Sequence, residues 1–300
     1  ANPILTWETM KIYNGGVDFS FFNRKLYGTV DAFYRVRDGI PGSRAVSLPS
    51  SFGAELPLEN LNSVDTRGWE LNLGTSGHIG KFIYDISGNL SWARSKWKEY
   101  DEPVYTDPDQ ERIYKREGRW TDVRYGYVSD GLFTSQAEID ALDYTYKDLN
   151  GNSSLRPGDI KYVDLNGDKV LDWRDQKEIG KGTLPTWTYG FNMNFKYHDF
   201  DLSALFQGAF GYTTYIDLTK APSTLKFDNR WTEKENDPHS LVARPGGAST
   251  NGYYSDFNNH NTAYLRLKNL SIGYNLPKAL ISKAGIQQLR IYMAGTNLFT

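Results

Sequence analysis

The chain has no cysteine among its 300 residues, so disulfide bonds, thiolate catalysis and cysteine-based zinc sites are excluded. Its four histidines form no two-histidine metal motif of the His-Glu-x-x-His kind, and phosphate-binding loops of the Walker type are absent. Among 36 acidic residues, a carboxylate pair at glycosidase spacing is expected by chance alone. We therefore expect no enzymatic activity.

An excess of charge of one sign is also missing, and so are long apolar runs. The 34 basic and 36 acidic residues leave a net charge of −2, which gives no reason to expect nucleic acid as a partner. No run of about 18 apolar residues exists and the mean hydropathy is −0.58, which excludes a transmembrane helix. A transmembrane barrel remains open, because its strands turn only every second side chain toward lipid.

Aromatic residues, in contrast, make up 15% of the chain. The segment 187–197 shows what they do: its odd positions, from Trp187 to Tyr197, are all apolar or aromatic, and its even positions are small or polar. Since side chains alternate along a strand, one face would be wholly apolar. Eleven residues tilted by about 40° rise roughly 27 Å, which matches the apolar band of an outer-membrane barrel with aromatic residues at both interfaces.

Seven further segments repeat this alternation. The eight predicted strands are 10–21, 26–36, 64–73, 82–92, 187–197, 200–210, 263–275 and 288–298. In 263–275 the apolar phase shifts between Leu267 and Leu270, which predicts a β-bulge.

The connections between these strands alternate in length. Short ones are predicted around 23–25, 74–80, 198–199 and 277–287, and long ones at 38–62, 98–184 and 212–261. Short periplasmic turns and long extracellular loops are typical of outer-membrane barrels, and 98–184 is long enough to require structure of its own. We predict an all-β fold, namely about eight strands of a larger transmembrane antiparallel β-barrel with long extracellular loops.

Blocks of sequence resemble the C-terminal part of SusC/RagA-type TonB-linked outer-membrane proteins. The strongest is PGDIKY at 157–162 followed by DLNGD at 164–168. Others, in family order over essentially the whole chain, lie at 2–8, 13–18, 67–71, 88–91, 179–180, 185, 189–191, 200–203, 206–208, 264–270, 273–277 and 297–300.

The resemblance implies a barrel of about 22 strands with a plug. Residues 1–300 would be the C-terminal part of this barrel, with the signal peptide, TonB box, plug and first strands upstream and the last strands downstream. It further implies a SusD-like surface lipoprotein as partner, energy from TonB with ExbB and ExbD, and surrounding outer-membrane lipid. The implied function is import of oligosaccharides or similar bulky nutrients, with a glycan or peptide as substrate.

Two other functions stay open. One is a siderophore or cobalamin receptor without a lipoprotein, against which the block at 158–168 argues by resemblance. The other is a soluble secreted β-protein that binds or cleaves glycans. In the soluble case Trp187, Phe191 and Phe195 would lie in a compact core sealed by a second layer.

One loop has the spacing of a calcium site. Oxygen ligands occupy positions 1, 3, 5, 7, 9 and 12 of an EF-hand-type loop, with the backbone carbonyl of Val170 at position 7. These residues are Asp164, Asn166, Asp168, Val170, Asp172 and Asp175. Lys169 stands where glycine is expected and Asp175 replaces the bidentate glutamate. The alternative is an acidic, turn-rich segment, and no other cofactor is expected.

Aromatic residues of the long loops are candidates for stacking against sugar rings. They are Trp120, Tyr125, Tyr127, Trp231, Tyr253, Tyr254 and Phe257. The alternative, favoured for any single one, is that they pack the loops together or against the lipoprotein. Polar strand positions would line the barrel interior, or solvate its wall or hold the plug: Asp31, Arg35, Arg37, Asp85, Asn89, Asn192, Asn194 and Lys196.

Overall fold

The computed structural model describes residues 2–45, 56–218 and 223–300. The chain divides into two compact units. The first, called the sheet unit, comprises Ala1–Asp101, Pro185–Gly211 and Ala263–Thr300. The second, called the loop unit, comprises Glu102–Leu184 and Tyr212–Thr262.

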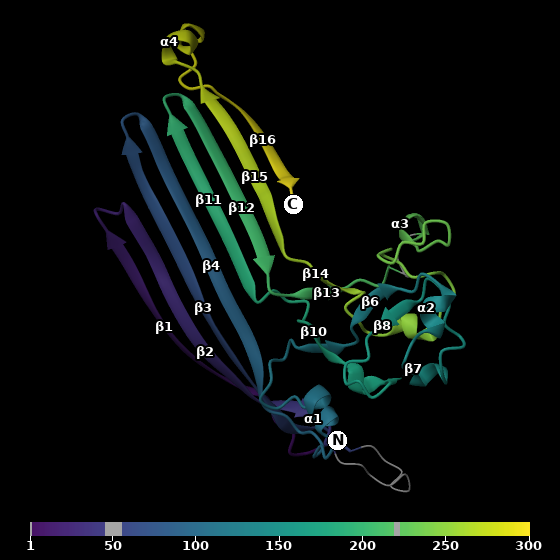
Figure 1. The fold of residues 1–300 in the computed structure, drawn as a ribbon. Coiled ribbons are helices and arrows are strands. Elements are labelled where there is room, and N and C mark those ends of the chain that lie inside the picture. Colours follow the sequence, from purple (N-terminus) through teal and green to yellow (C-terminus); the bar gives the residue numbers. More distant parts are fainter. Residues whose placement is uncertain (1, 46–55, 219–222) are drawn as a thin grey trace. The chain divides into compact units, whose positions relative to one another are not determined.

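The sheet unit is one eight-stranded antiparallel sheet in which chain neighbours pair in sequence order (Figure 1). Its strands are β1 (Thr9–Phe21), β2 (Leu26–Gly42), β3 (Glu59–Ile79), β4 (Phe82–Glu99), β11 (Trp187–Tyr197), β12 (Phe200–Phe210), β15 (Tyr264–Asn275) and β16 (Arg290–Phe299). A short helix α4 (Lys278–Ile281) and a 3-10 turn η6 (Ser282–Ala284) lie between the last two strands. All eight predicted strands are confirmed.

The predicted bulge in β15 is also confirmed. Leu205 of β12 pairs with Asn269 and Phe206 pairs with Leu267, which leaves Lys268 as the extra residue. The predicted turn at 74–80 is wrong, because β3 and β4 stay paired as far as Ile79 and Phe82. Side-chain alternation is lost in 74–79, but the backbone ladder continues there without it. The loop predicted at 38–62 shrinks to 43–58 for the same reason, and its residues 46–55 lie outside the described part of the chain.

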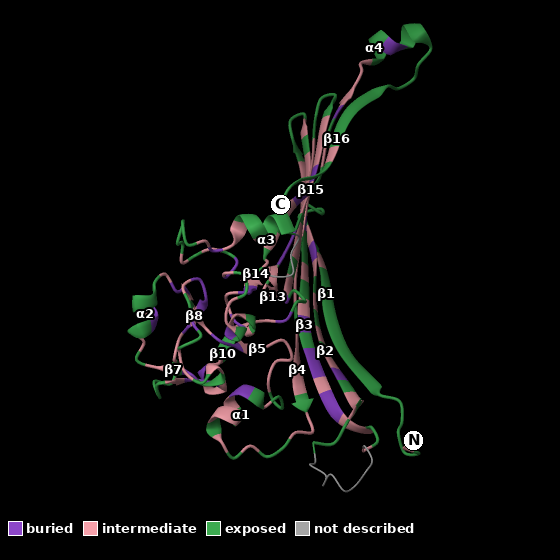
Figure 2. Ribbon diagram, turned by 90° about the vertical axis from the view of Figure 1, so that its right-hand side faces the viewer, coloured by how far each residue is buried: buried purple, intermediate pink, exposed green. Residues whose placement is uncertain are grey.

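Strand register assembles one apolar face from all eight strands. Residues directly opposite one another share a face, and the row through Phe191 contains only apolar residues and glycine. This row is Phe19, Gly28, Leu73, Gly88, Phe191, Phe206, Leu267 and Phe299. Phe191 is 41% exposed, so the sheet unit itself does not cover this face. Figure 2 shows how little of the sheet is buried.

Aromatic side chains gather at both ends of the apolar face. At the end nearest the long connections, Trp187 lies edge-on to Trp69 with ring centroids 5.6 Å apart and stacks on Phe210 at 5.4 Å. At the end with the short turns, Phe82 stacks on Phe195 at 5.5 Å. These two positions match the two interfaces of a bilayer.

In its described residues, the loop unit contains only short elements. They are α1 (Pro108–Tyr114), β5 (Arg124–Gly126), β6 (Ser129–Leu132), α2 (Gln136–Asp140), β7 (Thr145–Tyr146), η2 (Lys147–Leu149), β8 (Ile160–Tyr162), β9 (Val170–Leu171), η3 (Trp173–Asp175), β10 (Lys177–Gly180), β13 (Thr213–Tyr215), α3 (Ser223–Asn229), η5 (Ser249–Gly252) and β14 (Asn259–Asn261). Its strands form four two-stranded sheets. No helix in the described residues is long and apolar enough to cross a membrane.

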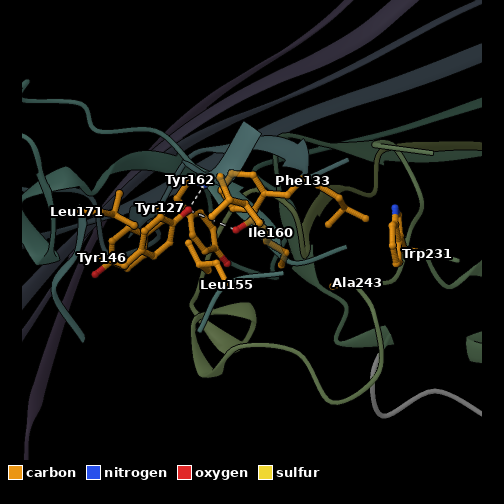
Figure 3. Packing of buried hydrophobic residues seen from close by; sticks show 11 residues of the cluster. Tyr127, Phe133, Tyr146, Leu155, Ile160, Tyr162, Leu171, Trp231 and Ala243 are labelled. Atoms are coloured by element: carbon orange, nitrogen blue, oxygen red, sulfur yellow. Dashed lines mark hydrogen bonds between the residues drawn. The ribbon is translucent and has the colours of Figure 1, made fainter. Parts of the chain in front are cut away.

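A hydrophobic core holds the loop unit together (Figure 3). Phe133, Leu155 and Tyr162 are fully buried in it, and Trp231 and Ala243 join it from the connection 212–261. Since the Tyr162 hydroxyl also donates to the Thr250 carbonyl at 3.0 Å, the connections 98–184 and 212–261 share one core. The prediction that 98–184 carries its own structure is confirmed.

Candidate functional site

The face of the sheet opposite the apolar row is polar. The adjacent row on that face is Asp18, Thr29, Asn72, Asn89, Gly190, Gln207 and Arg266. A hollow of about 600 Å³ is lined by residues of both faces, with Asp18, Tyr27 and Asn192 from the polar face and Phe19, Leu73 and Phe191 from the apolar row. Gly74 lets the Tyr27 ring lie flat on the sheet, because a Cβ there would come within 2.3 Å of it. Such a surface suits a wet interior.

The predicted interior positions of β2, β4 and β11 all fall on this polar face. Asp85 and Asn194, for example, are direct cross-strand partners. Arg37 of β2 makes an ion pair with Glu8 at 2.6 Å.

One ion pair on the polar face was not predicted from the sequence. Asp201 of β12 pairs at 2.6 Å with Arg290 of β16, although β15 lies between the two strands. The guanidinium passes over Gly273, where a Cβ would come within 2.5 Å of it. The only signal in the sequence was a glycine, Gly273, opposite Asp201, and this signal does not identify Arg290 as the partner of Asp201.

Four of the candidate loop aromatics pack the loop unit. Tyr127 and Trp231 are buried in its core, and Tyr253 and Phe257 lie against it. Tyr127 and Tyr253 stack with ring centroids 4.5 Å apart, and the Tyr253 hydroxyl donates to Asp148 at 2.6 Å. Burial raises the pKa of Tyr127 to about 12, which keeps the phenol protonated at neutral pH. For these residues the structure matches the packing interpretation.

The remaining three aromatics are half-buried. Tyr125 accepts a hydrogen bond from Arg119 at 3.2 Å, and Tyr254 stacks on Tyr215 at 5.1 Å. Trp120 is half-buried in the segment before β5. Contact with substrate stays a prediction for all seven.

Asp159, from the strongest sequence block, is the central polar residue of the loop unit. It is fully buried, and Arg244 donates to it at 2.9 and 3.3 Å. Asn251 and the Ala248 amide donate at 2.9 and 3.1 Å, and the Arg156 amide closes the adjacent turn at 2.9 Å. A buried charge is tolerated only when paired and hydrogen-bonded in this way. Asp159 thus fastens the connection 212–261 to the connection 98–184.

Gly158, next to Asp159, shows why this block has its residue types. Its φ of +87° lies in the left-handed region that favours glycine, and a Cβ would come within 2.4 Å of the Trp231 ring. The glycine therefore allows Trp231 to cover the turn.

The loop 164–175 directs its carboxylates inward onto its own backbone. Asp164 accepts from the amides of Gly167 and Lys169 at 2.8 and 2.9 Å, and buried Asp175 accepts from the amides of Leu165 and Asp172. Lys169 takes the left-handed conformation, with φ +67°.

Two cations approach the same loop: Lys147 and Arg174 contact Asp172 at 3.0 and 2.9 Å. In the described residues no group of three or more histidine or acidic side chains is placed to hold a metal ion. The calcium site stays a prediction. Calcium titration of the full-length protein, with and without Asp168→Ala, tests it.

The two carboxylates that close the loop have shifted pKa values of opposite sign. Burial raises the pKa of Asp175 above the ordinary value, against the backbone hydrogen bonds that it accepts. Burial acts the same way on Asp172, but the Arg174 amide and the Lys147 ammonium outweigh it and lower the pKa of Asp172. Compared with the unfolded chain, the folded loop holds the Asp175 proton more tightly and the Asp172 proton less tightly.

We expect the loop to be most stable near pH 4, about the ordinary aspartate pKa. As pH rises through the raised pKa of Asp175, the stability that Asp175 contributes to the loop is lost. As pH falls through the lowered pKa of Asp172, the stability that Asp172 contributes is lost. Asp175→Asn should abolish the loss of stability as pH rises and keep the loss of stability as pH falls. Hydrogen exchange of 164–175 in the full-length protein, corrected for intrinsic rates, measures both. Protection that climbs from pH 4 to pH 7 in the unmodified protein would contradict the assignment.

The antiparallel sheet with one apolar and one polar face is a section of a transmembrane β-barrel wall. The chain also contains the folded loop unit. No family model matches the chain. It is 28% identical over 319 residues to TonB-dependent receptor P3 of Formosa agariphila, covering 100% of the chain and 30% of that receptor. It is 25% identical over 282 residues to TonB-dependent receptor SusC of Bacteroides thetaiotaomicron, covering 91% of the chain and 26% of that receptor.

Solved structures show the same fold. The RagAB peptide transporter matches with a TM-score of 0.67 and 21% identity, over 99% of this chain and 32% of that one. The predicted resemblance to SusC/RagA-type TonB-linked outer-membrane proteins is confirmed, and the chain is similar to TonB-dependent receptors over its whole length. It spans about 30% of the length of the curated relatives that it matches. That residues 1–300 are the C-terminal barrel part stays a prediction.

Proposed function

We propose that the protein containing this chain imports oligosaccharides or similar bulky nutrients across the outer membrane, energised by TonB with ExbB and ExbD. The observation that carries the proposal is the row through Phe191, apolar across all eight strands and backed by a polar row. A sheet with one face for lipid and one for water is what a nutrient passage requires. No chemical step is assigned to this chain.

The loop unit would help to capture the cargo rather than line the path through the barrel. Its core and the Asp159–Arg244 pair make it a folded body that can present a fixed surface to cargo or to a partner. We assign the partner as a SusD-like surface lipoprotein, supported by the similarity to SusC. Five of the candidate aromatics are half-buried and so remain partly accessible: Trp120, Tyr125, Tyr253, Tyr254 and Phe257.

The cargo class is a glycan or a peptide. Similarity to SusC over 91% of the chain supports the first, and the fold shared with a RagAB peptide importer is compatible with the second. A siderophore or cobalamin receptor is the second candidate within transport. A soluble glycan-binding or glycan-cleaving protein is disfavoured, because Phe191 is 41% exposed rather than sealed in a core of the sheet unit.

Growth of a deletion strain on panels of glycans and of peptides as sole nutrient tests the proposal. We expect loss of growth on a narrow set of these substrates, with restoration by the intact gene. The same gene with its TonB box removed should fail to restore growth. A defect confined to iron- or cobalamin-limited medium would favour the second candidate. Recovery of the protein from cells without detergent would overturn import altogether.

A further inference from the structure

Two hollows adjoin in the loop unit and share a wall residue. The first, called the Tyr144 hollow, has a volume of about 330 Å³, and the second, called the Pro238 hollow, has a volume of about 380 Å³. Asp130 of β6 lines both. Each volume lies at the lower end of the range for small-molecule sites, about 300–1,000 Å³. A ligand made of linked small units can therefore occupy both hollows at once, with Asp130 between its units.

Asp130 carries an ion-pair partner at this junction. Its side chain is 62% exposed and pairs with Lys161 of β8 at 2.7 Å, and Lys161 also contacts Glu138 of α2 at 3.1 Å. Lys161 points outward, because its neighbours Ile160 and Tyr162 are buried in the core. A carboxylate accepts several hydrogen bonds and an ammonium donates three, so the pair can offer a ligand both kinds of contact.

The wall of the Pro238 hollow comes from a distant part of the chain and is held against β6. The Leu132 amide donates to the Pro238 carbonyl at 2.9 Å. Gly131, with φ +77°, makes this approach possible, because a Cβ there would come within 2.8 Å of the same carbonyl oxygen. Asp237 then accepts from the His239 amide at 2.9 Å and fixes the turn that follows.

The Tyr144 hollow is held in a similar way. The Tyr144 hydroxyl donates to the Tyr162 carbonyl, and the Thr145 amide donates to the Lys169 carbonyl at 3.0 Å. On the same wall, Asp164 accepts from the Lys169 amide at 2.9 Å. Because both walls are fixed before a ligand arrives, binding costs little ordering of the protein.

The walls carry ionisable groups of both signs and two aromatic rings. The acidic and basic residues are Asp130, Asp143, Lys161, Asp164, Lys169 and His239. Half-buried Tyr144 lies on one wall and half-buried Phe257 on the other. This mixture favours a neutral ligand that donates and accepts hydrogen bonds and has apolar ring faces.

We propose that the two hollows together bind a neutral oligosaccharide, with sugar rings on either side of Asp130. Sugar hydroxyls donate to the carboxylates and accept from the ammonium groups, and the apolar faces of the rings pack against Tyr144 and Phe257. The inference rests on the proposed import of nutrients and selects a glycan over a peptide as the cargo.

A peptide is disfavoured because amides of the sheet formed by β6 and β8 are already bonded. Extended peptides commonly bind by adding a strand to a sheet edge. Here the Ser129 amide donates to Asp256 at 2.8 Å, and the Tyr162 amide opposite it donates to the Tyr146 hydroxyl at 2.9 Å. These donors are not available to a peptide backbone.

The test titrates the full-length protein, purified in detergent, with neutral oligosaccharides of graded length and with a library of short peptides. We expect oligosaccharides to bind, and affinity to rise with length until both hollows are filled. Asp130→Ala should weaken the tightest oligosaccharide by about tenfold or more, because it removes a charged acceptor. Asp143→Ala and His239→Ala, one in each hollow, should each weaken it several-fold.

Asp140→Ala on α2 is the matched control and should leave binding unchanged. All four substituted side chains are exposed, and resistance of 102–184 and 212–262 to trypsin establishes that each variant is folded. Loss of affinity in only one of the two hollow variants, or an equal loss in Asp140→Ala, would overturn the proposal. Binding of peptides alone, or of no probe, would overturn it as well.

The growth test of import is independent of these titrations. A deletion strain that loses growth on glycans, with binding unchanged in the three hollow variants, would remove this site and keep import. Binding that depends on the hollows, in a protein whose deletion leaves growth unchanged, would remove import and keep the site.

Discussion

Phe191→Arg is expected to lower the stability of the full-length barrel in a bilayer by about 2–4 kcal/mol, because it places a cation near the middle of the lipid-facing band. Phe191 lies in the central part of β11, and its cross-strand neighbours are Gly88 and Phe206. Neither offers a carboxylate to the new guanidinium. Urea titration of folding into lipid vesicles, followed by tryptophan fluorescence, measures the change, and outer-membrane abundance should fall with it.

The neighbouring position supplies the control. Asn192 is one residue along the same strand and lies on the polar face, with Ser87 and Leu205 as its cross-strand neighbours. Asn192→Arg adds the same side chain to water instead of lipid and should cost less than about 1 kcal/mol. Should Asn192→Arg prove as costly as Phe191→Arg, the assignment of the two faces would be wrong.

Asp159→Ala is expected to destabilise the loop unit by about 3–5 kcal/mol, since it removes one partner of a buried ion pair. Arg244, Asn251 and the Ala248 amide would lose their shared acceptor at once. In the full-length protein, trypsin cleavage within 102–184 and 212–262 should then speed up by about a hundredfold or more, as the open population grows. Transport should fail while the barrel stays folded.

Asp140→Ala is the matched control for this change. Asp140 of α2 is exposed, and its carboxylate accepts a hydrogen bond from Gln136 at 3.0 Å. Removing this side chain should therefore cost about 0.5 kcal/mol of stability or less. Asp159→Asn keeps the size of the side chain but not the charge, and should fall between the two. Unchanged cleavage in Asp159→Ala would show that the hydrophobic core alone holds the two connections together.

The strands of the sheet were predictable because lipid and water select opposite residues at alternate positions. In β11 every odd residue is apolar, and this period alone fixes the strand, its faces and its length. The phase shift in β15 likewise revealed the bulge at Lys268. Where neither solvent imposes alternation, as in 74–79, the sequence carried no signal and the backbone ladder alone decided where the strand ends.

The sequence by itself determined the alternating strands, the two faces of the wall and the resemblance to TonB-linked proteins, because each depends on residues near one another in the chain or on their order. Only the tertiary structure decided which distant residues meet. Asp159 reaches Arg244 across 85 positions, and Asp201 reaches Arg290 over a glycine of an intervening strand. Arg67 faces Arg94 only through the register of β3 and β4. Such pairings follow from strand register and from the closure of long connections onto one core, and neither is written in local periodicity.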